Sequence, residues 1–299
     1  MQKYSIFNLI KNAFSNHHNW DLAWKDPTPK KEYDVVIIGG GGHGLATAYY
    51  LAKEHNITNV AIIEKGWIGG GNVGRNTTII RSNYMHDDNA LFSEFGMDLW
   101  RRMSQDLNYN VMFSPRGIIN LAHSDAQMNV YSRRGNSMRL NGIDAVLLNR
   151  EQVKEIIPMA DFSDNVRFPI FGALMQPSAG TARHDAVAWG YARQADSMGV
   201  DIIQNCEVTG FDIAGGKING VRTSRGDIKV KKIGLCVAGS TNILAEKLNI
   251  NLPVETHLLQ ACVSEPIKPI LDRVVTFGAG HFYISQSDKG EMVMGGDLD

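Results

Sequence analysis

The sequence has few cysteines, no long apolar run and almost no excess of charge of either sign. Its cysteines, Cys206, Cys236 and Cys262, are far apart and form no Cys-x-x-Cys pair, so we expect buried free thiols and no disulfide framework. No apolar stretch approaches the roughly 20 residues that span a bilayer. The formal charge of -1 provides no basic field for nucleic acid or an anionic membrane. These absences predict a cytoplasmic chain with no membrane and no nucleic acid as partner.

The start of the chain lacks the features of a secretory signal. The run MQKYSIFNLIKNAF has a broken apolar stretch and no small-residue cleavage pattern. Residues 1–31 mix polar and aromatic side chains and end in prolines and lysines, so we interpret them as an extension outside the core fold. This extension is either a disordered leader or, as its Trp and Phe residues suggest, a segment that docks on another surface.

The most informative feature present is a glycine-rich turn between an apolar strand and an apolar helix. Residues 33–52 read YDVVIIGGGGHGLATAYYLA, and Gly39, Gly41 and Gly44 occupy the positions of G-x-G-x-x-G. These glycines allow a tight turn, the approach of a pyrophosphate to bare backbone, and close helix–strand packing. The N-terminus of the helix adds free N–H groups and a partial positive charge.

The second strand, Val60–Ile63, ends in Glu64, whose carboxylate can accept hydrogen bonds from a ribose diol. Strand, helix and strand form a βαβ unit with a right-handed crossover, which predicts an α/β dinucleotide-binding domain. Near residues 232–240 a buried strand runs into a small-residue turn, and we expect it to complete the same sheet.

Other segments predict further elements. A helix is expected over residues 88–105, with Leu91, Phe95, Leu99 and Met103 as a buried stripe at spacing four. Paired strands are expected over 111–121 and a strand over 168–175. The chain ends on residues 291–297, which read as a strand entering a loop, so we expect a truncated sequence with an incomplete second domain.

Three further segments carry a family resemblance: KGWIGGGNVGRNTTIIRSNY, QPSAGTARHDAVAWGYARQA and MGVDIIQNCEVTGF. With the glycine turn, they resemble the FAD-dependent amine oxidoreductases of the D-amino-acid oxidase and sarcosine oxidase superfamily, most closely the beta-subunit family of heterotetrameric sarcosine oxidases. The resemblance implies an α/β (α+β overall) fold, in which a Rossmann-like FAD-binding domain (32–110 and 178–250) adjoins a substrate domain on a mainly antiparallel sheet (111–177 and 251–299).

The resemblance also assigns cofactor contacts. The pyrophosphate of a non-covalent FAD would lie against the glycine turn, and Glu64 would hold its adenosine ribose. His43 could instead be a turn residue that contributes only its N–H, and Arg75 could be a solvated surface cation. The predicted FAD contacts are Gly39, Gly41, Gly42, His43, Gly44, Glu64, Lys65, the flavin-end residues Asn72, Arg75, Thr77 and Ile79, and the backbone of Val208.

Two residues are expected to carry more specific chemistry. Arg81 resembles the arginine that clamps the substrate carboxylate, since a guanidinium fork can donate two parallel hydrogen bonds to it. It could instead cap a strand or pair with a structural acid. His184 resembles the histidine that bonds covalently to the 8α-methyl of a second flavin, FMN, with Arg183 near the FMN phosphate or ring. The plainer interpretation is a histidine at a helix start, satisfied by Asp185. The other histidines have no metal-like spacing, so no metal is predicted.

The resemblance implies oxidative demethylation of sarcosine, in which FAD accepts electrons from the substrate and FMN passes them to oxygen, giving hydrogen peroxide. It further implies alpha, gamma and delta partner subunits, NAD on the alpha subunit, and tetrahydrofolate on a partner as acceptor of the one-carbon unit. Two alternatives stay open: a dimethylglycine or D-amino-acid dehydrogenase of the same fold, and a non-catalytic FAD-binding subunit.

Overall fold

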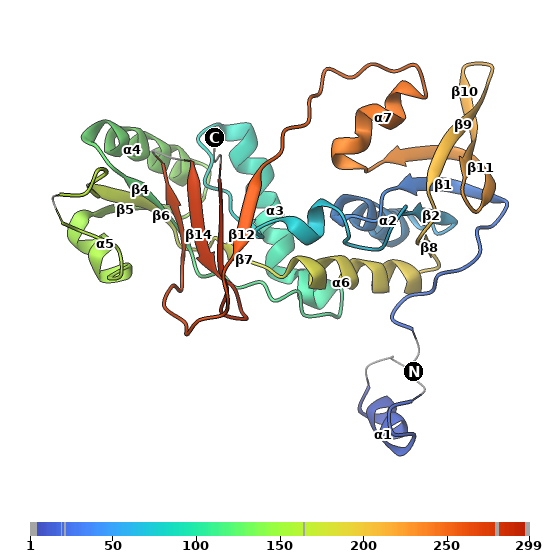
Figure 1. The fold of residues 1–299 in the computed structure, drawn as a ribbon, viewed down its shortest axis with the longest axis horizontal. Helices are drawn as coiled ribbons and strands as arrows, with labels where there is room; N and C mark the ends of the chain where they lie inside the picture. The colour runs from blue at the N-terminus through green and yellow to red at the C-terminus, as the bar shows by residue number, and fades with distance from the viewer. Residues whose placement is uncertain (1–4, 19, 21, 164, 279–280, 297–299) are drawn as a thin grey trace. The chain divides into compact units, whose positions relative to one another are not determined.

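The structure, a computed structural model, describes residues 5–18, 20, 22–163, 165–278 and 281–296 (Figure 1). Parts of the predicted extension (1–4, 19 and 21) and the end of the predicted last strand (297) therefore lie outside the described residues. The helices are α1 (Ile6–Phe14), α2 (Gly42–His55), α3 (Asp87–Asp106), α4 (Asp125–Leu140), α5 (Arg150–Ile156), α6 (His184–Ser197) and α7 (Thr241–Glu246), with 3-10 turns η1 (Asn72–Arg75) and η2 (Ala238–Ser240). The strands are β1 (Glu32–Ile38), β2 (Val60–Ile63), β3 (Ile79–Ile80), β4 (Ile118–Ala122), β5 (Val146–Asn149), β6 (Gly172–Gln176), β7 (Gly180–Thr181), β8 (Asp201–Ile203), β9 (Val208–Ala214), β10 (Lys217–Thr223), β11 (Gly226–Leu235), β12 (Gln260–Val263), β13 (Val274–Phe277), β14 (Phe282–Gln286) and β15 (Met292–Gly296).

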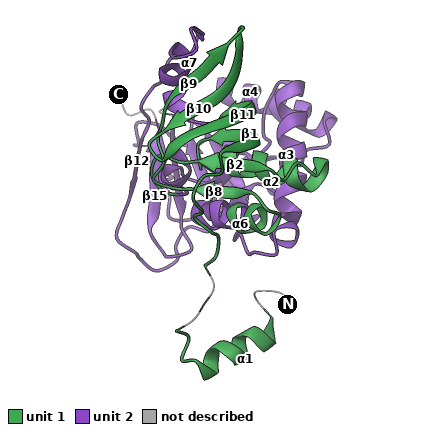
Figure 2. Ribbon diagram, turned by 90° about the vertical axis from the view of Figure 1, so that its right-hand side faces the viewer, with its two compact units in different colours: residues 1–40, 44–67, 192–235 green, residues 41–43, 68–191, 236–299 purple. Residues whose placement is uncertain are grey.

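The chain divides into two compact units (Figure 2). Unit 1 comprises residues 1–40, 44–67 and 192–235, and unit 2 comprises residues 41–43, 68–191 and 236–299. The functional domains predicted above, 32–110 with 178–250 and 111–177 with 251–299, stay predictions.

Unit 1 is built on a six-stranded sheet in the order β8-β2-β1-β11-β10-β9. Strands β8, β2, β1 and β11 are parallel, and β10 and β9 continue the sheet as antiparallel hairpins. All four residues of β2 are buried, as expected for an inner parallel strand whose sequence is a continuous apolar run. The predicted βαβ unit, β1-α2-β2, is therefore confirmed, as is the return of a late strand to the same sheet.

Unit 2 holds a seven-stranded sheet in the order β12-β15-β14-β13-β4-β6-β5. Among the described strands of this sheet, only β13 and β4 pair in parallel, which confirms the predicted mainly antiparallel sheet. Helix α5 packs Val153 into a core with Ala173, whereas α4 packs Met138 into a core with Leu174. Because neighbouring residues of a strand point to opposite faces, α4 and α5 cover opposite faces of β6.

Local sequence explains where these two helices begin. The Ser124 hydroxyl accepts the N–H of Gln127 at 3.2 Å and caps α4. Asn149 and Gln152 form a reciprocal capping box at the start of α5. Such caps satisfy N–H groups that have no partner within the helix.

The predicted buried stripe on the helix over 88–105 is wrong in part. Helix α3 forms as expected, but Leu91 is 53% and Phe95 62% exposed, whereas Ala90, Met97 and Met103 are buried. The helix has apolar residues on two faces, and a spacing of four residues does not by itself show which face packs against the core.

Three strand predictions also need correction. Residues 111–114 do not pair with β4; instead the Ser114 and Thr181 backbones bond to each other, and Gly117, at a φ of +85°, precedes β4. The strand expected over 168–175 begins only at Gly172. The late strand at 232–235 is the end of one long strand, β11, and it is half-buried to exposed rather than buried.

Of the three free cysteines, only Cys206 is buried, so the expectation of buried thiols holds for one of them. Cys236 is half-buried and Cys262 is exposed on β12, which lies at the edge of its sheet. None of the described helices is both long and apolar enough to cross a membrane.

Candidate functional site

The glycine-rich turn has the backbone geometry that its motif predicts. Gly39 has a φ of +112°, a left-handed conformation that favours glycine, and its N–H donates to Ile63 O at 2.9 Å. A Cβ atom on Gly44 would lie 2.0 Å from Gly39 O, so only glycine fits there. A Cβ atom on Gly41 would meet no atom of the described residues within 4 Å. The turn is therefore tight on one side and open to a ligand on the other.

Helix α2 begins in this turn, at Gly42. Its N-terminus brings N–H groups that have no partner within the helix, and a partial positive charge, to the open side of the glycines. His43 is exposed in the first turn of α2, a position where a backbone N–H is sufficient for anion binding.

Glu64 is fixed by backbone groups on both sides of it. Its Oε2 accepts the N–H of Gly40 at 2.7 Å, and its Oε1 accepts the N–H of Gly66 at 2.8 Å. Each carboxylate oxygen can accept a second hydrogen bond, so the group still has capacity for two hydroxyls. The other predicted contacts in unit 1 are Lys65, which is exposed, and Val208, which is buried at the start of β9.

The predicted flavin-end residues lie in unit 2, along the segment from η1 to β3. Asn72 and Arg75 are exposed in η1, and Thr77 is half-buried. The Asn76 side chain accepts the N–H of Thr78 at 2.8 Å, and Thr78 has a φ of +58°, so the segment turns sharply before β3. Ile79 then pairs with Thr181 of β7.

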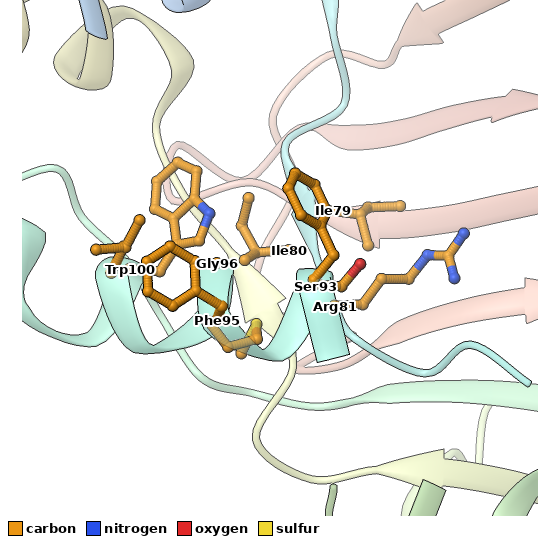
Figure 3. A pocket seen from close by; sticks show the side chains of 10 residues that line it. Ile79, Ile80, Arg81, Ser93, Phe95, Gly96 and Trp100 are labelled. Atoms are coloured by element: carbon orange, nitrogen blue, oxygen red, sulfur yellow. The ribbon is translucent and has the colours of Figure 1, made fainter. Parts of the chain in front are cut away.

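Arg81 follows β3 and is held by its neighbours in sequence. Its Nη1 donates to Asn83 Oδ1 at 2.6 Å, and its guanidinium lies 4.6 Å from the centre of the Tyr84 ring. Residue Arg81 also lines a cavity of about 320 Å³ beside α3, but its side chain extends away from Phe95 and Trp100 (Figure 3). No carboxylate of the described chain pairs with Arg81, so the alternative of a structural ion pair is not what the structure contains.

His184 is the first residue of α6. Its Nδ1 accepts the N–H of Asp185 at 2.7 Å, which places the proton of a neutral ring on Nε2. Arg183 Nε and Nη2 donate to the two Asp185 carboxylate oxygens at 3.0 and 3.2 Å, and Arg183 Nη1 donates to Asp288 at 3.0 Å. The Asp185 contact of the plainer interpretation is therefore present.

The charges of this group are set by those contacts. Burial raises the pKa of the Asp185 carboxyl, but hydrogen bonds from Arg183 and from the Ala186 N–H outweigh burial and leave the pKa below its usual value. The hydrogen bond to Asp185 raises the pKa of Arg183. Arg183 and Asp185 thus form a fully charged pair beside the imidazole of His184.

A second cavity, of about 650 Å³, was not predicted from the sequence. Asp288, the partner of Arg183, lines it together with Arg116 and Arg273. Arg273 Nη1 donates to Arg116 O at 2.6 Å, and Arg273 Nε is buried with no hydrogen-bond partner in the described part of the chain. Asp288 is 105 residues from Arg183, and no local pattern marks such a pairing. In the same described part, no three His, Cys, Asp or Glu side chains cluster as metal ligands do.

Comparisons with known proteins identify relatives of this chain. The sarcosine oxidase subunit beta of Rhizobium meliloti (strain 1021) is 60% identical over 297 residues, which are 99% of this chain and 71% of that protein. The sarcosine oxidase subunit beta of Rhodobacter capsulatus is 52% identical over 299 residues, 100% of this chain and 72% of that protein.

Among solved structures, L-proline dehydrogenase from P. horikoshii is similar, with a TM-score of 0.84 and 27% identity over 90% of this chain and 71% of that one. The family described as DAO: FAD dependent oxidoreductase matches residues 34–299. The chain therefore belongs to the FAD-dependent oxidoreductases of the DAO family, among the beta subunits of sarcosine oxidase.

Proposed function

We propose that this chain is the flavin-carrying subunit of an enzyme that oxidises sarcosine at its N-methyl carbon. The balanced reaction consumes sarcosine, oxygen and water and yields glycine, formaldehyde and hydrogen peroxide. The observation that carries the proposal is the 60% identity to a sarcosine oxidase subunit beta over 99% of the chain. The same identity supports sarcosine over dimethylglycine or a D-amino acid as the substrate.

The residues present fit an FAD. Gly41 leaves room for a pyrophosphate at the start of α2, and Glu64 is oriented by Gly40 and Gly66 with acceptor capacity to spare for the ribose diol. Lys65 and the Val208 backbone are proposed contacts of the adenosine end, and Asn72, Arg75, Thr77 and Ile79 of the flavin end. When bound, FAD supplies the two-electron acceptor for the reaction.

The contribution of the chain itself to catalysis is orientation. Arg81 would receive the substrate carboxylate through two parallel N–H donors, which fixes the direction of the N-methyl group. Its guanidinium has no competing carboxylate in the described chain, which supports this role.

We extend the proposal to a covalent FMN on His184. Nδ1 is engaged by the Asp185 N–H, so Nε2 is the nitrogen that would form the bond. Nε2 would give up its proton, the 8α-methyl would lose one hydrogen, and the two electrons of this coupling would pass through the flavin to oxygen. The cavity of about 650 Å³ that Asp288, the partner of Arg183, lines would provide room. Arg116 and Arg273 line this cavity together with Asp272 and Asp288. The buried Arg273 Nε lies 4.0 Å from an Asp272 carboxylate oxygen, has no hydrogen bond in the described chain, and would donate to a phosphate oxygen. FMN would supply the site from which electrons reach oxygen. Replacement of His184 by alanine is expected to remove FMN and to leave FAD bound.

The assembly belongs to the proposal as well. Both relatives described above are named as a subunit, which supports partner chains. We propose alpha, gamma and delta subunits, with NAD on alpha and tetrahydrofolate bound by a partner, in the cytoplasm.

The experiment that tests the function is an anaerobic titration of the assembled enzyme with sarcosine. We expect sarcosine to bleach the flavin absorption and to release formaldehyde in proportion. If dimethylglycine or a D-amino acid bleaches the flavin and sarcosine does not, the substrate is that compound and not sarcosine. No bleaching by any amino acid, in an enzyme that retains its flavin, would favour a non-catalytic FAD-binding subunit.

A further inference from the structure

Arg81 belongs to a small polar cluster that sequence patterns did not reveal. Its other members are Asn83 and Tyr84, two and three residues further along, and Arg134 on helix α4. Asn83 is completely buried, and its side chain accepts the 2.6 Å hydrogen bond from Arg81 Nη1. Its backbone carbonyl accepts from Arg134 Nε at 2.5 Å and also from Arg134 Nη2. One asparagine thus connects two guanidinium groups.

These contacts restrict Arg81 in two directions. The hydrogen bond to Asn83 fixes one edge of the planar guanidinium, and the Tyr84 ring covers one of its faces at 4.6 Å. A guanidinium has five N–H donors, so the bond to Asn83 leaves enough for a bidentate carboxylate.

The backbone that carries Arg81 is also held on its other side. The N–H of Ser82 donates to Gln176 Oε1 at 3.0 Å, and the Ser82 hydroxyl donates to Glu94 at 2.5 Å. Ser82 and Gln176 are both completely buried. Arg81 is consequently presented from a rigid segment, because both residues that follow it are locked by hydrogen bonds.

The cluster keeps its positive charge. Neither Arg81 nor Arg134 pairs with a carboxylate anywhere in the residues that the structure describes. Burial lowers the pKa of Arg134, and the nearby Arg81 charge lowers it further. A neutral amide that links the two arginines restrains them without neutralising them, whereas an aspartate at position 83 would compete with any incoming anion.

We propose that Asn83, anchored through its carbonyl oxygen by Arg134, is a positioning residue that holds the Arg81 guanidinium in place for the substrate carboxylate. The inference rests on the proposed role of Arg81 in binding that carboxylate. The inference also explains why an asparagine is present although its Nδ2 is buried without a partner in the described part of the chain. The position needs the acceptor oxygen of a neutral side chain, and an amide provides it.

The test compares two ligands of the flavin-loaded enzyme assembled with its partner subunits. Methoxyacetate is sarcosine with an ether oxygen in place of the amine, and methoxyacetamide is its uncharged counterpart. Their dissociation constants are measured from the change in flavin absorption. The variants are Asn83→Ala, Asn83→Asp and Arg81→Met. The matched control is Asn120→Ala, which removes another buried asparagine of unit 2, one bonded to Leu174 O and to Thr276.

We expect Asn83→Ala to raise the dissociation constant of methoxyacetate about tenfold, as for the loss of one hydrogen bond to a charged group. The affinity for methoxyacetamide should change less than twofold, and Asn120→Ala should leave the ratio of the two affinities unchanged. Asn83→Asp preserves the shape of the side chain and should weaken the binding of methoxyacetate at least as much, because its carboxylate pairs with Arg81 and competes with that of the ligand. In sarcosine turnover, both Asn83 variants should raise KM more than they lower kcat.

The two proposals fail in different ways. If Arg81→Met weakens methoxyacetate and both Asn83 variants bind it as the parent does, Asn83 is not a positioning residue. If Arg81→Met itself binds methoxyacetate as the parent does, the role of Arg81 is wrong and the inference fails with it. Should Asn83→Ala not fold, Asn83→Asp decides, with an unchanged melting temperature as its control.

Discussion

Glu64 Oε2 accepts a 2.7 Å hydrogen bond from the backbone N–H of Gly40, so the acid at the end of the second strand is tied to the glycine turn that follows the first. A Cβ atom on Gly40 would lie only 3.0 Å from the Glu64 Cβ, which shows how closely the two segments approach. The pairing explains how the sequence holds a carboxylate beside a pyrophosphate turn without a cation between them.

Replacement of Glu64 by glutamine should therefore weaken FAD binding. The amide NH2 of glutamine is a donor and would face one of the two backbone N–H groups that the carboxylate now accepts. The loss of one hydrogen bond to a charged group predicts about a 10- to 100-fold higher dissociation constant for FAD. Fluorescence titration of the apoprotein measures it. Glu54→Gln, on the exposed end of α2, is the control and should bind FAD as the parent does.

Alanine substitutions of two glycines in the turn should have separate effects, one on the stability of the apoprotein and the other on FAD binding. Gly44→Ala places a methyl group 2.0 Å from Gly39 O and should lower the melting temperature of the apoprotein. Gly41→Ala meets nothing within 4 Å in the described chain, so the apoprotein should melt as the parent does while FAD affinity falls. Equal melting temperatures for the two variants would show that the turn does not have this geometry.

The strand, turn, helix and second strand could be predicted because each depends on residues close in sequence. The apolar run before Gly39 and the acid after Ile63 are sufficient to predict these elements. The wrong stripe on α3 has a different origin: Leu91 and Phe95 share the periodicity of a core, but only the rest of the fold decides that Ala90 and Met97 are buried instead.

The contacts around the candidate site could not be predicted, since they join distant residues. Arg134 reaches Asn83 from 51 residues away, and Asp288 reaches Arg183 across 105. The segment before β4 was predicted as a strand, yet Met112 has a φ of +54° and the chain bonds to Thr181. Pairings of this kind depend on the tertiary fold and leave no periodic trace.

Arg81→Lys should act mainly on substrate binding. A lysine ammonium cannot donate two parallel hydrogen bonds in the fixed geometry of a guanidinium. We expect KM for sarcosine to rise about 10- to 100-fold, with a smaller change in kcat. Steady-state kinetics of the assembled enzyme measure this, and Arg102→Lys, on the exposed side of α3, should behave as the parent. An unchanged KM would remove Arg81 from the substrate site.

The charged pair beside His184 predicts a pH dependence of stability. The folded-state pKa of Asp185 lies below its unfolded value of about 3.9, so its contribution is complete above that value and is lost as the pH falls through the folded pKa. Asp185→Asn should lower stability near neutral pH by roughly 1 kcal/mol, and the difference from the parent should shrink below about pH 4. Melting curves between pH 3 and 7 measure it. Asp98→Asn, in an exposed pair on α3, should show no such difference.

The most direct test of the two-flavin account is to denature the assembled enzyme with acid and to identify the flavin that stays on the protein. We predict that FAD is released, while one flavin of FMN mass remains on the peptide that contains His184. Release of all the flavin as FAD, with an unmodified His184 peptide, would contradict the account.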